Sequence, residues 1–230
     1  MRINLDPTLL LMLPGLILSL WAQYKVKSAY QKYGAVPTGR GIPAQQAVKA
    51  LLTGQNAGYV QIEQVPGQLT DHFDPKTDTL RLSEGVYGSS SVAAVAIAAH
   101  EAGHALQKEE NYPFLSLRSL MVPVVNFGSK LSWPVFLMGL IFSWEPLMTA
   151  GIVLFLLVVA FSLVTLPVEF NASNRALTHL TASGWYTEDE LSGMKKVLTA
   201  AALTYVASFV SAFLQLLRLV AIANRNRRRR

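Results

Sequence analysis

Four apolar stretches constrain this chain more than any other feature of its sequence. A helix needs about 20 mainly apolar residues to cross the roughly 30 Å hydrocarbon core of a bilayer. Stretches close to this length run over residues 8–22, 120–142, 147–166 and 197–223. Charged residues make up only 15% of the 230-residue chain, whereas an average soluble domain has about 25%. We therefore predict a mainly α-helical membrane protein with several spans, and not a freely soluble globule.

The first apolar stretch, residues 8–22, has the length of a signal-peptide core. A cleaved signal peptide would end in small residues, but Trp21 and Gln23 stand at that place. We therefore interpret residues 1–24 as an uncleaved N-terminal membrane anchor.

The second and third stretches lie close together and predict a membrane hairpin over residues 119–166. Only the tetrapeptide Ser-Trp-Glu-Pro at 143–146 separates them, and tryptophan is common at the membrane interface. Because a hairpin returns the chain to the side from which it started, the polar segments 25–118 and 167–196 should lie on the same side. These two segments are predicted to form the two parts of one water-exposed domain.

The fourth stretch, residues 197–223, combines apolar character with a polar stripe. Its polar residues follow one another at steps of 4, 3, 4 and 3, which places them on one face of a helix: Thr204, Ser208, Ser211, Gln215 and Arg218. Since an arginine at mid-membrane costs about 2.5 to 3.5 kcal/mol, we expect this face to turn away from lipid.

Basic residues at two places give conflicting indications of membrane orientation. Lys25, Lys27 and Lys32 beside the first span favour a cytoplasmic position for the polar domain. The basic tail at 224–230 favours the opposite orientation if the fourth stretch spans fully. The side of the domain is therefore undecided. Much of the formal net charge of +6 lies in this tail, so the body of the protein is not predicted to bind nucleic acid.

The larger polar segment predicts helices around a small β element. Helical spacing after Gly41, with Pro43 near the start and Gly54 after the end, indicates a first helix. Residues 59–65 and 79–83 have the character of strands, and the intervening 74–78 is a turn signal. A second helix follows one of the serines at 89–91, any of which can cap it.

That second helix carries the motif His100-Glu101-Ala102-Gly103-His104, an instance of HExxH. Two histidines four residues apart project from one face of a helix and can each give one ring nitrogen to zinc, while the glutamate reaches the metal-bound water. The chain has no cysteine, so any metal must be held by His, Asp or Glu. Gly103 permits close approach of another backbone or of a substrate.

Catalytic zinc needs a third protein ligand and leaves its fourth position to water. Glu169, which follows the predicted hairpin, would complete a gluzincin-type site on the correct side of the membrane. Its alternative role is a carboxylate at the start of an interfacial helix, near the helix dipole. His179 and His72 are the other candidates: His179 is interpreted as a surface histidine, and His72 as either structural or an oxyanion contact.

Three segments resemble the bacterial neutral zinc metallopeptidase family typified by YugP, which is itself similar to HtpX and the CAAX proteases. They are LTDHFDPKTDTLRLSEGVYGSSSVAAVAIAAHEAGHALQ at 69–107, LPVEFNASNRA at 166–176 and LTYVA at 203–207. The resemblance implies a zincin-type domain built around the HEAGH helix, with one Zn²⁺ per chain.

By this resemblance His100, His104 and Glu169 map onto the zinc ligands, and Glu101 maps onto the catalytic base. Related sequences often carry aspartate where Asn171 stands. If that aspartate orients a ligand histidine, Asn171 would do so more weakly.

These features together predict an integral protein of the bacterial cell membrane that hydrolyses peptide bonds with a zinc-activated water and Glu101 as general base. Its predicted partners are peptide or membrane-protein substrates and the lipid bilayer, with no nucleic acid; its oligomeric state is not indicated. Candidates for stabilising the transition state are His72, Tyr87 and Arg175. Residues 79–83 could be an edge strand that receives substrate, or an internal strand.

Two other functional classes stay open at this level. The first is a proteolytically silent, zinc-stabilised chaperone or scaffold, although an intact Glu101 argues against a purely structural site. The second is a membrane adaptor whose basic tail at 224–230 binds anionic lipid or nucleic acid, since each basic residue near an anionic surface contributes about 1 kcal/mol.

Overall fold

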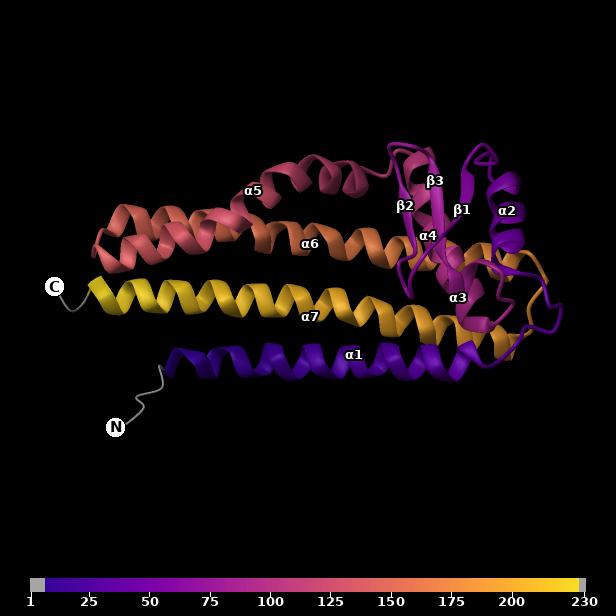
Figure 1. Cartoon of the computed structure of the whole chain (residues 1–230), viewed down its shortest axis with the longest axis horizontal. Coiled ribbons are helices and arrows are strands. Elements are labelled where there is room, and N and C mark those ends of the chain that lie inside the picture. The colour runs from indigo at the N-terminus through magenta and orange to yellow at the C-terminus, as the bar shows by residue number, and fades with distance from the viewer. Residues whose placement is uncertain (1–6, 228–230) are drawn as a thin grey trace. The chain divides into compact units, whose positions relative to one another are not determined.

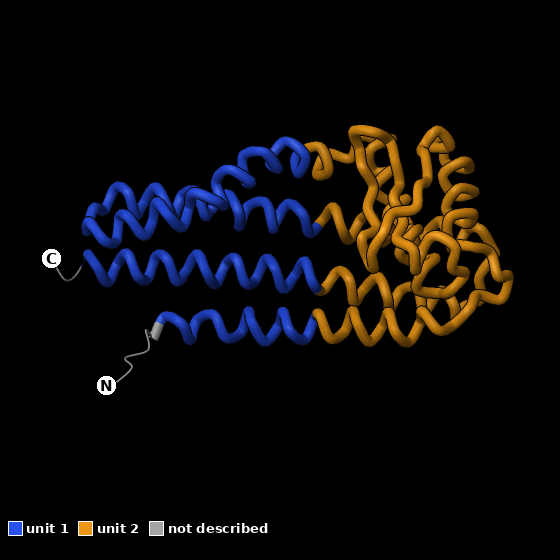
Figure 2. Tube along the Cα trace, viewed as in Figure 1, with its two compact units in different colours: residues 1–22, 117–166, 204–230 blue, residues 23–116, 167–203 orange. Residues whose placement is uncertain are grey.

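The computed structural model describes residues 7–227, which form two compact units (Figures 1 and 2). Unit 1 comprises residues 1–22, 117–166 and 204–230, of which 7–22 and 204–227 are described, and unit 2 comprises residues 23–116 and 167–203. The helices are η1 (Pro7–Met12), α1 (Leu13–Gly34), α2 (Ala44–Gly54), α3 (Glu84–Tyr87), α4 (Val92–Glu109), α5 (Pro113–Ile141), α6 (Glu145–Ala182) and α7 (Glu188–Arg227). The strands are β1 (Gln61–Val65), β2 (His72–Asp74) and β3 (Thr79–Ser83).

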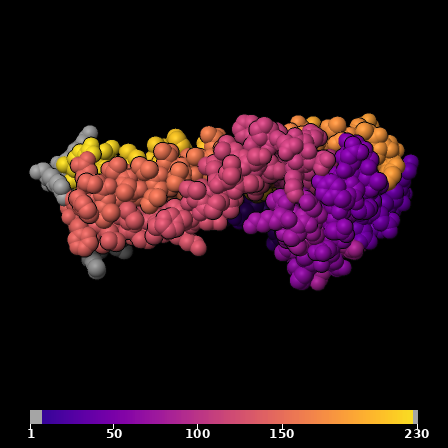
Figure 3. Space-filling model, turned by 90° about the horizontal axis from the view of Figure 1, so that it is seen from above, coloured from indigo at the N-terminus to yellow at the C-terminus, as the bar shows by residue number. Residues whose placement is uncertain are grey.

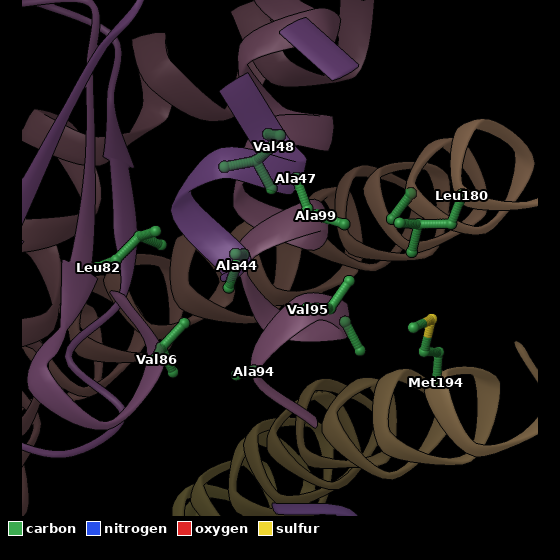
Figure 4. Close-up of a cluster of buried hydrophobic side chains, with 14 of the residues drawn as sticks. Ala44, Ala47, Val48, Leu82, Val86, Ala94, Val95, Ala99, Leu180 and Met194 are labelled. Atoms are coloured by element: carbon green, nitrogen blue, oxygen red, sulfur yellow. The ribbon is translucent and has the colours of Figure 1, made fainter. Parts of the chain in front are cut away.

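Helix α4 forms the centre of unit 2. It begins after Ser91, whose side-chain oxygen accepts a hydrogen bond from the Ala94 N–H at 3.2 Å, so the serine cap is the third of the three predicted candidates. Alanine and valine dominate the buried length of α4, which lets neighbouring elements pack closely against it. Figure 4 shows its side chains Val95 and Ala99 among those of α2, α6 and α7.

The sheet has three strands in the order β1-β3-β2, with β1 parallel and β2 antiparallel to β3. The edge-strand interpretation of residues 79–83 is therefore wrong, and the alternative of an internal strand is right. Leu80 and Leu82 are fully buried, and Thr79 and Ser83 on the opposite face are buried too. Strand β2 was not predicted, because three residues between Asp71 and Pro75 are too few to show a strand pattern.

The long helices confirm a membrane protein that is mainly α-helical with a small sheet. Four segments are long and apolar enough to cross a membrane: Thr8–Gly34, Pro113–Ile141, Glu145–Ala182 and Glu188–Arg227. Each extends beyond the predicted apolar stretch at one end or both. The hairpin turn is correspondingly shorter than expected, because Glu145 and Pro146 already belong to α6.

Helix α6 continues without a break through Pro167. Glu169 consequently lies inside a long helix and not at a helix start, so its alternative interpretation as a carboxylate at a helix N-terminus is wrong. A proline in a helix interior removes one backbone hydrogen bond, and the sequence around Pro167 gave no sign that the helix would continue.

Unit 1 leaves much of its apolar surface exposed. Its buried cluster is small and centres on Phe136, Met148 and Leu219. Large apolar side chains such as Leu120, Ile141 and Phe142 are at least 70% exposed. In the space-filling view of Figure 3, α5 and α6 make up most of the visible face of this unit. Such a surface suits a lipid environment.

The polar stripe of α7 is engaged within unit 1 only in part. The Ser211 hydroxyl lies 3.2 Å from that of Ser19 and donates to the Gly15 carbonyl at 3.3 Å, and Arg218 donates to Thr8. Ser208, by contrast, is exposed and satisfies its hydroxyl by donating to the Thr204 carbonyl of its own helix. The contacts of Ser211 and Arg218 agree with the expectation that the polar face turns away from lipid, and for Ser208 this stays a prediction. Of the basic tail, residues 228–230 lie outside the described residues.

Candidate metal centre

Three side chains from two helices of unit 2 converge on one point. Helix α4 supplies His100 and His104, which lie one turn apart, and α6 supplies Glu169. The Oε2 atom of Glu169 lies 3.2 Å from Nε2 of His100 and 3.6 Å from Nε2 of His104. One ligand atom from each residue lies within 4.8 Å of the others. These three residues could therefore hold a metal ion.

The approach of α6 to α4 depends on Gly103, in the middle of the HExxH motif. A Cβ atom at this position would lie 2.5 Å from the backbone oxygen of Ala172 on α6, closer than side-chain atoms can come without a shift. The sequence indicated a close approach here by a backbone or a substrate, and the structure shows that it is the α6 backbone. This contact brings Glu169 within reach of the two histidines.

The other nitrogen of each histidine ring has its own partner. Nδ1 of His100 lies 3.0 Å from the Ser173 hydroxyl, and Nδ1 of His104 lies 2.9 Å from Oε1 of Gln107. Partners at Nδ1 leave both Nε2 atoms directed at Glu169. Sequence reasoning missed Ser173 and Gln107, although each lies about one helical turn from a predicted ligand, at i+4 from Glu169 and i+3 from His104.

Glu101 lies beside this cluster and contacts the sheet. Its Oε2 atom accepts a hydrogen bond from the Phe73 backbone N–H of β2 at 3.1 Å. Burial raises the pKa of the Glu101 carboxyl, and the neighbouring histidines oppose this shift. Phe73, like Ser173 and Gln107, was not indicated by the sequence, because its contact with Glu101 depends on where β2 packs.

Comparison with known proteins agrees with the chemistry of this cluster. Residues 8–224 match the model of a protein family described as "Putative neutral zinc metallopeptidase". The chain belongs to this family. It is also 44% identical over 212 residues to the "Putative membrane protease YugP" of Bacillus subtilis (strain 168), covering 92% of this chain and 94% of that protein. No solved structure matches the chain.

Two further residues predicted from the sequence lie in a hydrogen-bond network behind the cluster. Asn171 accepts hydrogen bonds from Gln107 at 2.9 Å and from Arg175 at 2.7 Å. Arg175 also forms an ion pair with Glu110. Asn171 does not contact a histidine directly, and Gln107 lies between it and His104.

The remaining candidate residues lie elsewhere in unit 2. His72 is exposed, and its Nδ1 atom lies 2.8 Å from the Thr70 carbonyl. Tyr87 packs against the buried core. His179 lines a pocket of about 330 Å³ together with residues of α2. Within residues 7–227, His100, His104 and Glu169 are the only three metal-ligating side chains grouped in this way.

Proposed function

We propose that this protein is a membrane-embedded, zinc-dependent endopeptidase with His100, His104 and Glu169 as ligands of one zinc ion per chain. The observation that carries the proposal is the convergence of two imidazole nitrogens and a carboxylate oxygen within 4.8 Å. Catalytic zinc typically has three such nitrogen and oxygen ligands and keeps one position for water. The three side chains of this chain fit that requirement. Because Gly103 has no side chain, α6 can approach α4 closely enough to bring Glu169 to the two histidines.

The proposed chemistry assigns Glu101 as general base. A zinc ion held by His100, His104 and Glu169 would polarise the substrate carbonyl and lower the pKa of a bound water toward about 7. Glu101 accepts the proton of the attacking water and then delivers it to the leaving amine. Two features support this role: Glu101 lies between the histidines on the same helix, and the Phe73 N–H holds one of its carboxylate oxygens. A buried carboxyl with a raised pKa is suited to returning the proton.

Strand β2 is the element on which we expect substrate to lie. It is an outer strand of the sheet, and its residue Phe73 contacts Glu101. An extended peptide can add to an exposed strand through backbone hydrogen bonds. This assignment replaces β3, which lies in the middle of the sheet. The substrate class is then an extended segment of a peptide or membrane protein.

The test uses the full-length protein in detergent with fluorescein-labelled casein as substrate. Replacing Glu101 with Gln removes the base but keeps the ligands, so zinc content should stay at one per chain while cleavage falls by several orders of magnitude. A chelator should abolish cleavage by the wild type, and added zinc should restore it.

The matched control is Glu84→Gln, at an exposed position of the short helix α3. This variant should change neither the zinc content nor the rate of casein cleavage. Near-normal cleavage by Glu101→Gln would overturn the proposed mechanism. A wild type that binds zinc but cleaves nothing would favour the silent scaffold.

A further inference from the structure

Gln107 is a fully buried polar residue, and its side-chain amide uses both ends. Oε1 faces Nδ1 of His104 at 2.9 Å. Nε2 donates to the Val168 carbonyl at 2.7 Å and to Oδ1 of Asn171 at 2.9 Å. Rotating the amide by 180° would place Oε1 against two acceptors and leave buried polar groups without a hydrogen-bond partner, which is unfavourable. The amide therefore has one favoured orientation.

Two groups set the direction of these hydrogen bonds: the Val168 carbonyl, which can only accept, and, further away, Arg175. A guanidinium group donates hydrogen bonds and cannot accept them, so the atom of Asn171 that lies 2.7 Å from Arg175 Nε must be the oxygen. That oxygen must then receive a donor from Gln107, which turns Oε1 of Gln107 toward His104. A glutamine oxygen can only accept, so Nδ1 of His104 must carry the proton.

His100 is constrained from the other side of its ring. Its Nδ1 atom faces the Ser173 hydroxyl, which can rotate to donate or to accept, whereas its Nε2 atom lies 3.2 Å from Oε2 of Glu169, and an ionised carboxylate only accepts. In the zinc-free protein the two histidines of the motif therefore differ: Glu169 favours a proton on Nε2 of His100, and Gln107 favours a proton on Nδ1 of His104, whose Nε2 lies 3.6 Å from Glu169.

We propose that Arg175, Asn171 and Gln107 form a relay of positioning residues that holds His104 as the Nδ1–H tautomer, with the Nε2 lone pair directed at the metal cluster. The relay also links the two helices that supply the ligands, because Gln107 belongs to α4 and Asn171 and Arg175 belong to α6. The relevance of the relay to zinc rests on the proposed function. The tautomer itself does not, because it is a property of the zinc-free protein.

The first experiment therefore uses zinc-free, full-length protein labelled with ¹⁵N at its four histidines. At a pH where the imidazole rings are neutral, ring nitrogen shifts distinguish the two tautomers. We expect wild-type His104 to be in the Nδ1–H form and Gln107→Leu to show a mixture of both forms. His100 should be unchanged. The matched control is Gln46→Leu, an exposed glutamine of α2, which should leave His104 unchanged.

The second experiment measures zinc affinity by competition with a chelator. Loss of a partner that orients a metal ligand lowers affinity by about 10- to 100-fold, and we expect this for Gln107→Leu. Asn171→Leu should shift the tautomer and the affinity in the same direction. Asn171→Asp should retain the Nδ1–H tautomer and the zinc affinity, because a carboxylate oxygen can accept the hydrogen bonds that Gln107 and Arg175 donate.

The proposal is overturned if His104 stays fully Nδ1–H in Gln107→Leu, or if Asn171→Leu and Asn171→Asp bind zinc equally well. If Gln107→Leu does not fold, the two Asn171 variants decide in both measurements. A wild type that shows the expected tautomer but cleaves no peptide would contradict the proposed function and leave the relay intact.

Discussion

The two units of this protein bury their apolar residues differently. In unit 2, side chains from α2, β3, α4, α6 and α7 form one large buried cluster. In unit 1 the buried cluster is small, and leucine, isoleucine and phenylalanine side chains are exposed along the helices. The hydrophobic effect drives burial only where water is the alternative. Unit 2 therefore packs as a water-exposed domain does, and unit 1 presents a surface for lipid.

This difference also explains where polar chemistry can be held in place. Interiors packed to high density transmit small changes in position, and the helices that supply His100, His104 and Glu169 contribute to such a core. In unit 1 the polar contacts between helices include that of the Ser19 and Ser211 hydroxyls and the ion pair of Arg227 with Glu145. A site that needs several side chains within a fraction of an ångström fits the first environment.

The largest effect is expected from Glu169→Ala, which removes the proposed third zinc ligand from the tightly packed unit 2. Without its third ligand the site should lose zinc, and cleavage should fall by several orders of magnitude. This differs from Glu101→Gln, which should keep zinc. The measurement is metal content by mass spectrometry beside casein cleavage.

The matched control for Glu169→Ala is His179→Ala, which should keep both zinc and activity. If the Glu169 variant retains stoichiometric zinc while the His179 or His72 variant loses it, a three-histidine site replaces the present assignment.

A pair of leucines compares burial in the two units directly. Leu82 of β3 is fully buried, and Leu120 of α5 is 74% exposed. Leu82→Ala should lower the free energy of unfolding by about 2 to 5 kcal/mol, because it leaves a cavity. Leu120→Ala should change it by less than about 0.5 kcal/mol. Chemical unfolding in the same detergent measures both; equal effects would show that the units do not differ in packing.

A pair of helical glycines sharpens the comparison at backbone contacts. A Cβ at Gly103 would meet the Ala172 oxygen at 2.5 Å, whereas a Cβ at Gly128 of α5 has its nearest neighbour at 3.5 Å. Gly103→Ala should therefore cost about 1 to 3 kcal/mol of stability and weaken zinc binding. Gly128→Ala should be tolerated. Unchanged zinc affinity in Gly103→Ala would contradict the tight crossing of α4 and α6.

The smallest effect concerns pH and the half-buried carboxylate of Asp74 in unit 2. Hydrogen bonds from the Lys76 N–H, Arg81 and Thr77 lower the pKa of Asp74 to about 2, against about 3.9 in an unfolded chain. Its stabilising contribution is therefore present above pH 4 and is lost as the pH falls toward 2. Asp74→Asn should reduce the dependence of the melting temperature on pH within this window. If the melting temperature of the variant depends on pH as strongly as that of the wild type, the lowered pKa of Asp74 is contradicted.

Prediction from the sequence succeeded where local spacing controls the outcome. The HExxH pattern places His100 and His104 on one face of α4 because four residues make about one helical turn. The serine cap, the helix after Pro43 and the membrane character followed in the same way from short-range signals. The chain's membership of the neutral zinc metallopeptidase family agrees with the resemblance seen in the motif segments.

Prediction failed where the outcome depends on what a segment packs against. The alternation at 79–83 is compatible with an edge strand or a central one, and only the unpredicted β2 makes β3 central. Pro167 normally favours a helix boundary, yet α6 continues through it. Spacing assigns Ser208 and Ser211 to one polar stripe, but it does not show that the Ser208 hydroxyl bonds within its own helix while that of Ser211 reaches the Gly15 carbonyl.

The amino-acid sequence by itself determined the local chemistry of this protein: a histidine pair with its glutamate on one helix, a cysteine-free set of ligands, and helices apolar enough to span a membrane. Only the tertiary structure decided which groups surround that chemistry. Ser173 reaches His100 because α6 crosses α4 at Gly103, and the Phe73 N–H reaches Glu101 because β2 lies against it. Gln107 lies one turn from His104 on α4 itself, but its acceptors Val168 and Asn171 belong to α6. Helical periodicity is a property of neighbouring residues, whereas a crossing of two helices depends on the packing of side chains far apart in the chain.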